Sequence, residues 1–137
     1  MYKLSASSLN LFLDCKRCFW LQIVKKVRRP DRGFPSLPSG MDRLLKEHFD
    51  RFMRKGELPP EIRNNDNVNG CKLFTNEELL KDWRNNRNGI QVLDKESGVM
   101  LRGAVDNILV KGEKLIVLDY KTKGFPVKED DHEHYRF

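Results

Sequence analysis

Several common features are scarce or missing in this sequence of 137 residues. It has three cysteines, Cys15, Cys18 and Cys71, an odd number that does not make a disulfide framework. No apolar run approaches the roughly 18 residues of a membrane-spanning helix, and polar residues 5–8 interrupt the N-terminus where a signal peptide would be hydrophobic. Internal repeats and low-complexity tracts are also missing. We therefore expect a cytoplasmic protein without a membrane partner, folded as a single domain over residues 1–137.

Charge is the first feature that is present in excess. The chain has 26 Lys and Arg residues against 20 Asp and Glu, a formal net charge of +6. The excess is concentrated in a few places, which include Lys25, Lys26, Arg28, Arg29 and Arg102. A basic patch binds phosphates by displacing counterions, so these side chains are candidates for holding a DNA backbone. The alternative is a solvated surface that only keeps the protein soluble.

Hydrophobic periodicity predicts helices in the first two thirds of the chain. Apolar residues recur there at steps of three and four. Helices are expected over residues 5–27, 40–54 and 75–85. Ser5 or Ser7 would cap the first helix, and Thr75 or Asn76 would cap the third. The segment between the first two helices is rich in Pro, Gly and Ser, which predicts a loop.

The last third of the chain changes to the period of strands. Strands are expected over Ile90–Asp94, Val99–Val110 and Lys114–Lys121. Helices followed by an antiparallel three-stranded meander are typical of the α+β class. Such a sheet, covered on one side, would leave an edge exposed. We therefore expect the chain to be a truncated piece of a larger domain.

The turn at Gly112-Glu113 allows a test of what the two last strands bring together. If these are the central residues of a type II′ hairpin, Lys111 lies opposite Lys114. The same register then places Asp106 opposite Asp119, with Cβ atoms about 5 Å apart on one face of the pair. A shift of one residue would move Asp106 to the other face.

Two carboxylates held this close repel each other, and burial adds to the cost. A divalent cation resolves both problems, because Mg²⁺ takes hard oxygen ligands and uses one or two carboxylates together with phosphate and water. Lys121 lies two residues after Asp119 and therefore on the same face. It could orient or help to deprotonate an attacking water, or neutralise charge that develops on a phosphate. Asp106, Asp119 and Lys121 are thus the candidate catalytic set, and an ordinary ion-paired strand end is the alternative.

The segment GAVDNILVKGEKLIVLDYKTKG resembles the active-site signature of the PD-(D/E)xK nuclease superfamily in its RecB-like branch. Gly103 and Asp106 fit the Gly-x-x-Asp element on one strand. The second element is an apolar strand that ends in Asp-Tyr-Lys-Thr, here residues 119–122. The opening SASSLNLFLDCKRCFWL is similar to the N-terminal pattern of RecB-like and CRISPR-associated RecB-like exonucleases.

This resemblance implies an α/β/α restriction-endonuclease-like core and a nuclease that cleaves DNA with Mg²⁺ or Mn²⁺. It implies that Asp106 and Asp119 are metal ligands and that Lys121 is the catalytic base or electrostatic helper. The setting would be DNA repair, recombination or defence, with a helicase or another protein of these systems as a possible partner. The family also carries a further helix and strand after the Asp-x-Lys strand, which is a second reason to expect a truncated domain.

The resemblance also raises the questions of a histidine metal ligand and of an iron–sulfur cluster. Members of this branch often have a metal-ligating His on a helix upstream of the sheet, and His48 is the candidate here, with Glu47 as a weaker alternative. His48 falls on an apolar stripe, so a packed core residue is the other interpretation. Some relatives hold an iron–sulfur cluster with one N-terminal and three C-terminal cysteines. Because no cysteine follows Cys71, we expect no cluster and interpret Cys15 and Cys18 as core residues.

Two rival functions remain open at this point. The first is a nuclease fold without turnover that serves as a nucleic-acid-binding module, which would bind DNA in a salt-sensitive way. The second is a small metal–thiolate module built on Cys15, Cys18 and Cys71.

Overall fold

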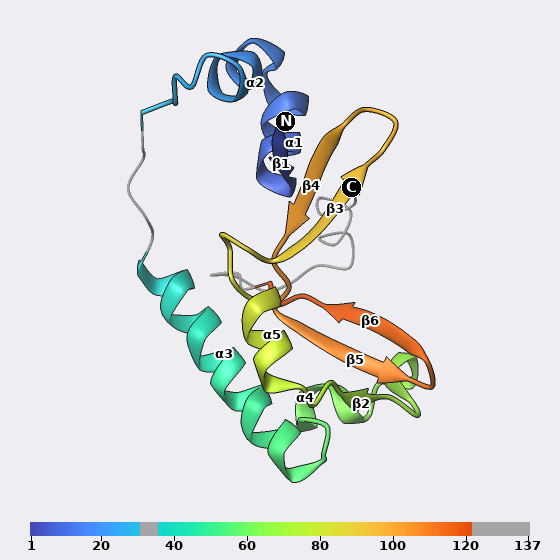
Figure 1. Ribbon diagram of the computed structural model, residues 1–137. Coiled ribbons are helices and arrows are strands. Elements are labelled where there is room, and N and C mark those ends of the chain that lie inside the picture. The colour runs from blue at the N-terminus through green and yellow to red at the C-terminus, as the bar shows by residue number, and fades with distance from the viewer. Residues whose placement is uncertain (31–35, 122–137) are drawn as a thin grey trace.

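The computed structural model describes residues 1–30 and 36–121 of the chain (Figure 1). Helices and two three-stranded sheets make up this part, which confirms the expected α+β class. Within it, no helix combines the length and the apolarity needed to cross a bilayer. Thr122 of the Asp-Tyr-Lys-Thr motif and the charged C-terminal segment lie outside the described residues.

The first sheet joins the N-terminus to the middle of the chain. Its order is β1 (Lys3–Ser5), β4 (Val99–Gly103) and β3 (Ile90–Asp94) (Figure 1). The pair β3–β4 is antiparallel, whereas β1 runs parallel to β4 with Ser5 opposite Arg102. The strand β1 was not predicted, because its three residues have no strand pattern of their own and depend on β4 for their hydrogen bonds.

The first predicted helix is two helices, α1 (Ala6–Asp14) and α2 (Lys16–Ile23). Ser5 caps α1 as expected, through a reciprocal capping box with Ser8. Cys15 breaks the run with extended backbone angles, φ −157° and ψ 99°. Its Sγ accepts a hydrogen bond from the Cys18 N–H at 3.3 Å and so caps α2. The periodicity missed this break because it does not detect a capping cysteine.

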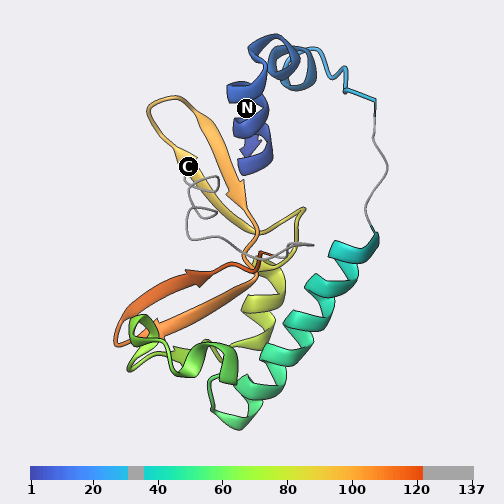
Figure 2. The same ribbon diagram turned by 180° about the vertical axis from the view of Figure 1, so that it is seen from behind.

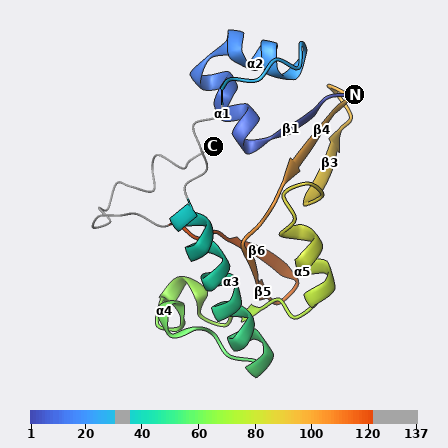
Figure 3. The ribbon, with the colours of Figure 1, turned by 90° about the vertical axis from the view of Figure 1, so that its left-hand side faces the viewer.

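The second sheet contains β2 (Lys72–Leu73), β5 (Asn107–Lys111) and β6 (Lys114–Leu118), in that order and antiparallel throughout. Helices α3 (Ser36–Lys55) and α5 (Glu77–Trp83) lie on the same side of the β5–β6 hairpin (Figure 2, Figure 3). The short α4 (Pro60–Arg63) and the 3₁₀ turn Asp66–Val68 connect α3 to β2. Asn76 caps α5 as expected, since its side chain accepts from the Leu79 N–H at 3.0 Å.

The hydrophobic core lies between these helices and β5. It consists of buried apolar side chains from α3, β2, α5 and β5 together with the loops before β2 and β5: Phe49, Met53, Cys71, Leu73, Leu80, Val105, Ile108 and Leu109. On β6, by contrast, Leu115 and Val117 are exposed. Among the described residues, β6 pairs with β5 alone and is the edge strand of this sheet.

The expected strand over 99–110 is broken at residues 104–106, so β4 and β5 belong to different sheets. The end of α5 binds the backbone at the break. The Val105 N–H donates to the Trp83 carbonyl at 3.1 Å, and Arg84 Nε donates to the Asp106 carbonyl at 2.8 Å. Because the end of α5 already satisfies these backbone N–H and C=O groups, the chain leaves the hydrogen-bond ladder of β4 before it enters that of β5.

Candidate active site

The β5–β6 hairpin has the register that the sequence predicted. Lys111 pairs with Lys114, and the ladder runs to Asn107 opposite Leu118. Gly112 has φ +59°, and Lys26 is the single described non-glycine residue with a positive φ, so Glu113 has a negative one. This is the pattern of a type II′ turn. Asp106 immediately precedes Asn107 and Asp119 immediately follows Leu118, so both lie at the same end of the hairpin.

The Asp106 carboxylate is held from two sides. Its Oδ2 accepts the backbone N–H of Tyr120 at 2.8 Å, which ties the end of β6 to the start of β5. Its Oδ1 lies 3.2 Å from Nζ of Lys46 on α3, and the side chain is 18 % exposed. Charge-assisted hydrogen bonds of this kind fix a carboxylate in one orientation.

Tyr120 anchors the same strand end in the core. Its ring packs on Phe49 with centroids 4.8 Å apart, and its hydroxyl accepts a hydrogen bond from Nδ2 of Asn107 at 2.9 Å. Burial raises the pKa of the Tyr120 hydroxyl well above its ordinary value, so it remains neutral in the physiological range. Tyr120 follows Asp119 in the chain and is hydrogen-bonded to Asp106, and it thus has a structural role in the motif.

Asp119 and Lys121 lie on the exposed side of this end and form an ion pair with each other. Both side chains are about half exposed, 52 % for Asp119 and 48 % for Lys121. Asp119 is therefore the more accessible of the two carboxylates. The exposed Asp119, the partly buried Asp106 and Lys121 thus lie at the end of the hairpin that is opposite the turn.

Arg84 connects the candidate site to the helices. Its guanidinium makes two hydrogen bonds of 2.9 Å to the Asp50 carboxylate and a third to the Asp106 carbonyl. The side chains are 15 % exposed for Arg84 and 22 % for Asp50. This bidentate pair joins α3 and α5 to the residue that carries the inner carboxylate.

Lys46, Asp50 and Arg84 were not predicted as site residues. A signal for two of them was present, because Asp42, Lys46 and Asp50 recur every four residues and so share one face of α3. On that face Lys46 pairs with Asp42 at 2.8 Å as well as with Asp106. Without the sheet register, however, nothing indicated what this polar face would meet.

His48 is placed on a different face of α3. Its Nε2 lies 3.1 Å from Oε1 of Glu61 on α4, and its ring packs on Phe52 with centroids 5.0 Å apart. Glu47 lies 4.0 Å from Arg43 on the same helix. In residues 1–30 and 36–121, no three or more His, Cys, Asp or Glu side chains lie close enough to hold a metal ion. Metal ligation by His48 remains a prediction.

The cysteines separate into two environments. Cys71 is buried in the core, whereas Cys15 and Cys18, expected as core residues, are only half buried at the α1–α2 break. The pKa of the Cys15 thiol is lowered, first by hydrogen bonding with Cys18 and then by Arg29. Cys71 thus lies in the core of the other sheet, apart from Cys15 and Cys18.

The predicted basic residues are also only partly brought together. Lys26, Arg28 and Arg102 line one cavity. Lys25 lies instead over the ring of Trp20, with Nζ 5.1 Å from its centroid. Arg29 pairs with Asp14 at 2.9 Å.

A sequence model of the PD-(D/E)XK nuclease superfamily matches residues 3–137. The chain belongs to this superfamily. The match spans both the N-terminal opening and the hairpin with its Asp-x-Lys end. Comparison with curated proteins and with solved structures gave no match.

Membership of the PD-(D/E)XK nuclease superfamily indicates a hydrolase that acts on nucleic acid, generally with a divalent metal. The donor set of this member fits such an ion, because Asp106 and Asp119 offer the hard carboxylate oxygens that Mg²⁺ and Mn²⁺ accept. If both carboxylates bound the ion, water and phosphate would fill its other coordination positions. Each carboxylate also has an ammonium partner, Lys46 for Asp106 and Lys121 for Asp119.

Proposed function

We propose that this member of the superfamily is a Mg²⁺- or Mn²⁺-dependent deoxyribonuclease of the RecB-like branch. The observation that carries the proposal is the hairpin register, which brings Asp106 and Asp119 to one end of two adjacent strands. Lys121 at that end supplies the third group of the Asp-x-Lys signature. We further propose a role in DNA repair, recombination or defence, with a helicase or another protein of these systems as partner.

In the proposed mechanism Asp106 and Asp119 are the residues that hold the cation. A bound divalent cation supplies Lewis acidity and stabilises the charge that develops on the phosphate. The Tyr120 N–H and the bidentate Arg84–Asp50 pair keep Asp106 in place during turnover. Lys121, already in contact with Asp119, orients the attacking water and offsets negative charge at the phosphate.

Labelled single- and double-stranded DNA and, in parallel, labelled RNA, each incubated with the protein and Mn²⁺, test the proposal. We expect Asp119→Asn and Lys121→Ala each to lower the cleavage rate by about a hundredfold or more. Glu113→Gln and Lys114→Ala, on the turn at the other end of the same hairpin, are the matched controls and should keep the wild-type rate. Equal rates for wild type, site variants and controls would refute the assignment, and cleavage of RNA alone would refute the choice of DNA.

A nuclease fold that binds nucleic acid without cutting it is the second candidate. It is favoured by one observation, since a lysine already neutralises each carboxylate. It predicts salt-sensitive binding of DNA and no dependence of any cleavage on Asp119 or Lys121. The same set of variants therefore separates the two functions.

A further inference from the structure

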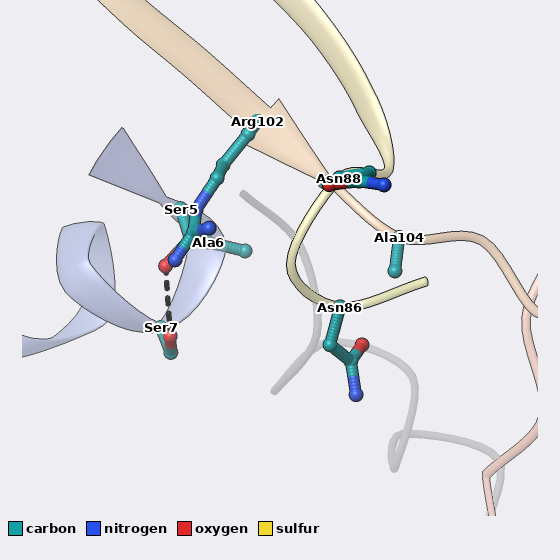
Figure 4. A pocket seen from close by; sticks show the side chains of 8 residues that line it. Ser5, Ala6, Ser7, Asn86, Asn88, Arg102 and Ala104 are labelled. Atoms are coloured by element: carbon teal, nitrogen blue, oxygen red, sulfur yellow. Dashed lines mark hydrogen bonds between the residues drawn. The ribbon is translucent and has the colours of Figure 1, made fainter. Parts of the chain in front are cut away.

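A polar cleft lies at the N-terminal sheet, and its lining includes neither Asp106 nor Asp119. It consists of two neighbouring cavities of about 400 Å³ and 410 Å³, and both are lined by Ser5, Ser7 and Arg102. Figure 4 shows the first cavity, with Ser5, Ser7 and Arg102 on one side and Asn86 and Asn88 on the other. The second cavity adds three cationic side chains, Lys3, Lys26 and Arg28.

The fold, not the local sequence, brings these residues together. The parallel pairing of β1 with β4 places Ser5 opposite Arg102. After α2 the chain turns back, with the Val27 N–H donating to the Leu21 carbonyl at 3.0 Å. Lys26 at this turn has φ +59°, which is uncommon for a residue with a side chain. The turn directs the segment with Lys26 and Arg28 to the cleft.

The lining has the chemistry of an anion site. Four cationic side chains and the hydroxyls of Ser5 and Ser7 face the two cavities, and none of the described residues that line them carries a carboxylate. The first turn of α1 also begins here: Ser5 Oγ accepts the Ser8 N–H, and the helix dipole adds partial positive charge at this end. Arg102 donates one N–H to the Arg87 carbonyl at 3.0 Å, and its guanidinium has four further N–H groups.

We propose that this cleft binds the phosphodiester backbone of a nucleic-acid strand. The inference rests on the proposed function and deepens it, because it assigns a place on the protein to the substrate outside the carboxylate site. The two cavities share three lining residues and therefore adjoin each other. Two adjoining cavities suit two successive phosphates of a strand better than a single free phosphate ion. Lys3, Ser5 and Ser7 join the site, whereas Lys25 over Trp20 and Arg29 paired with Asp14 are outside it.

Binding without metal tests the cleft separately from cleavage. The probe is a fluorescent single-stranded oligonucleotide, titrated with the full chain in EDTA and followed by anisotropy. We expect Lys26→Gln and Arg28→Gln each to weaken binding several-fold at low salt and to reduce the slope of log K against log salt by about 0.7. Lys95→Gln and Lys114→Gln remove the same charge from exposed turns elsewhere and should change the affinity less than twofold.

Ser7→Glu is a third variant, because it adds a negative charge at the wall common to both cavities. It should abolish most of the binding, whereas Ser7→Ala, which removes one hydroxyl and adds no charge, should weaken binding less than Lys26→Gln does. The two Ser7 variants should have the same melting temperature. Equal losses in the site variants and in the two lysine controls would overturn the proposal, since they would indicate general charge attraction. Displacement of the oligonucleotide by millimolar inorganic phosphate at constant ionic strength would also overturn it, in favour of a free-phosphate site.

The outcomes for the cleft and for the nuclease are distinguishable. Loss of metal-free binding in Lys26→Gln, together with wild-type and Asp119→Asn proteins that both fail to cleave, would retain the cleft and refute the nuclease. Asp119-dependent cleavage with unchanged binding in Lys26→Gln and Arg28→Gln would retain the nuclease and refute the cleft.

Discussion

The ammonium group of Lys46 lies 3.2 Å from Oδ1 of Asp106 and 2.8 Å from Oδ2 of Asp42. Lys46 therefore neutralises the inner carboxylate of the candidate active site from the adjacent helix. The pair is largely shielded, with 23 % of the Lys46 side chain and 18 % of the Asp106 side chain exposed. A cation that binds Oδ1 of Asp106 has to compete with this ammonium group.

We predict that Lys46→Met strengthens the binding of Mn²⁺. Removal of a positive charge next to a ligand raises the affinity for a cation, here by about three- to tenfold for a partly buried pair. Isothermal titration with Mn²⁺ measures the change, and Lys72→Met on β2 is the control that should leave the affinity as it was. If Lys46→Met binds Mn²⁺ more weakly than wild type, Lys46 supports the metal site instead of competing for it.

The Arg84–Asp50 pair should contribute more to stability than any exposed ion pair on the same helices. We expect Arg84→Ala to lower the free energy of unfolding by about 2–4 kcal/mol, because it leaves the Asp50 carboxylate and the Asp106 carbonyl unpaired in a partly buried place. Arg54 and Glu77 are a matched pair between the same helices, but their side chains are 59 % and 53 % exposed. Arg54→Ala should cost less than about 1 kcal/mol. Urea unfolding compares the two, and equal losses would contradict the prediction.

Short-range signals were sufficient for the register of the β5–β6 hairpin. The Gly112-Glu113 turn fixes the register between neighbouring strands, so the positions of Asp106 and Asp119 followed from the sequence once the turn type was assumed. Ser5 and Asn76 were predicted as caps for the same reason, since a cap interacts within one turn of its helix.

Contacts between distant segments could not be predicted. β1 is a strand through its pairing with β4 about 97 residues later, and the break at 104–106 lies where α5 binds the backbone. Lys46 and Arg84 reach Asp106 from two helices whose packing on the sheet has no signature in the sequence. The apolar stripe of the first predicted helix also did not indicate burial, because Leu9, Leu13 and Trp20 are exposed.

Gly89 should tolerate no side chain, whereas Gly98 on the same sheet should tolerate one at modest cost. Both have a positive φ, +56° for Gly89 and +67° for Gly98. A Cβ on Gly89 would lie 2.3 Å from the backbone oxygen of Gly103, while a Cβ on Gly98 meets nothing within 4 Å. We expect Gly98→Ala to cost about 1 kcal/mol, the penalty of a left-handed conformation, and Gly89→Ala clearly more. Thermal unfolding of both variants is the measurement, and a smaller loss for Gly89→Ala would contradict the close approach.

Tyr120 should make the folded protein sensitive to alkaline pH. Burial raises the pKa of its hydroxyl, so the folded state keeps a proton that the unfolded state releases near the ordinary tyrosine pKa of about 10. The contribution to stability is therefore complete below about pH 10 and is lost as the pH rises towards the pKa of the folded state. Tyr2 is exposed and is the control.

Urea unfolding at about pH 8 and about pH 11 gives the test. Wild type and Tyr2→Phe should lose stability between the two pH values, and Tyr120→Phe should lose less. At the lower pH, Tyr120→Phe should itself be less stable by about 1–3 kcal/mol, because Nδ2 of Asn107, a residue that is 1 % exposed, loses its acceptor. If all three proteins show the same fall, ionisation of Tyr120 is not coupled to unfolding, and its anchoring of the strand end beside Asp106 would rest on ring packing alone.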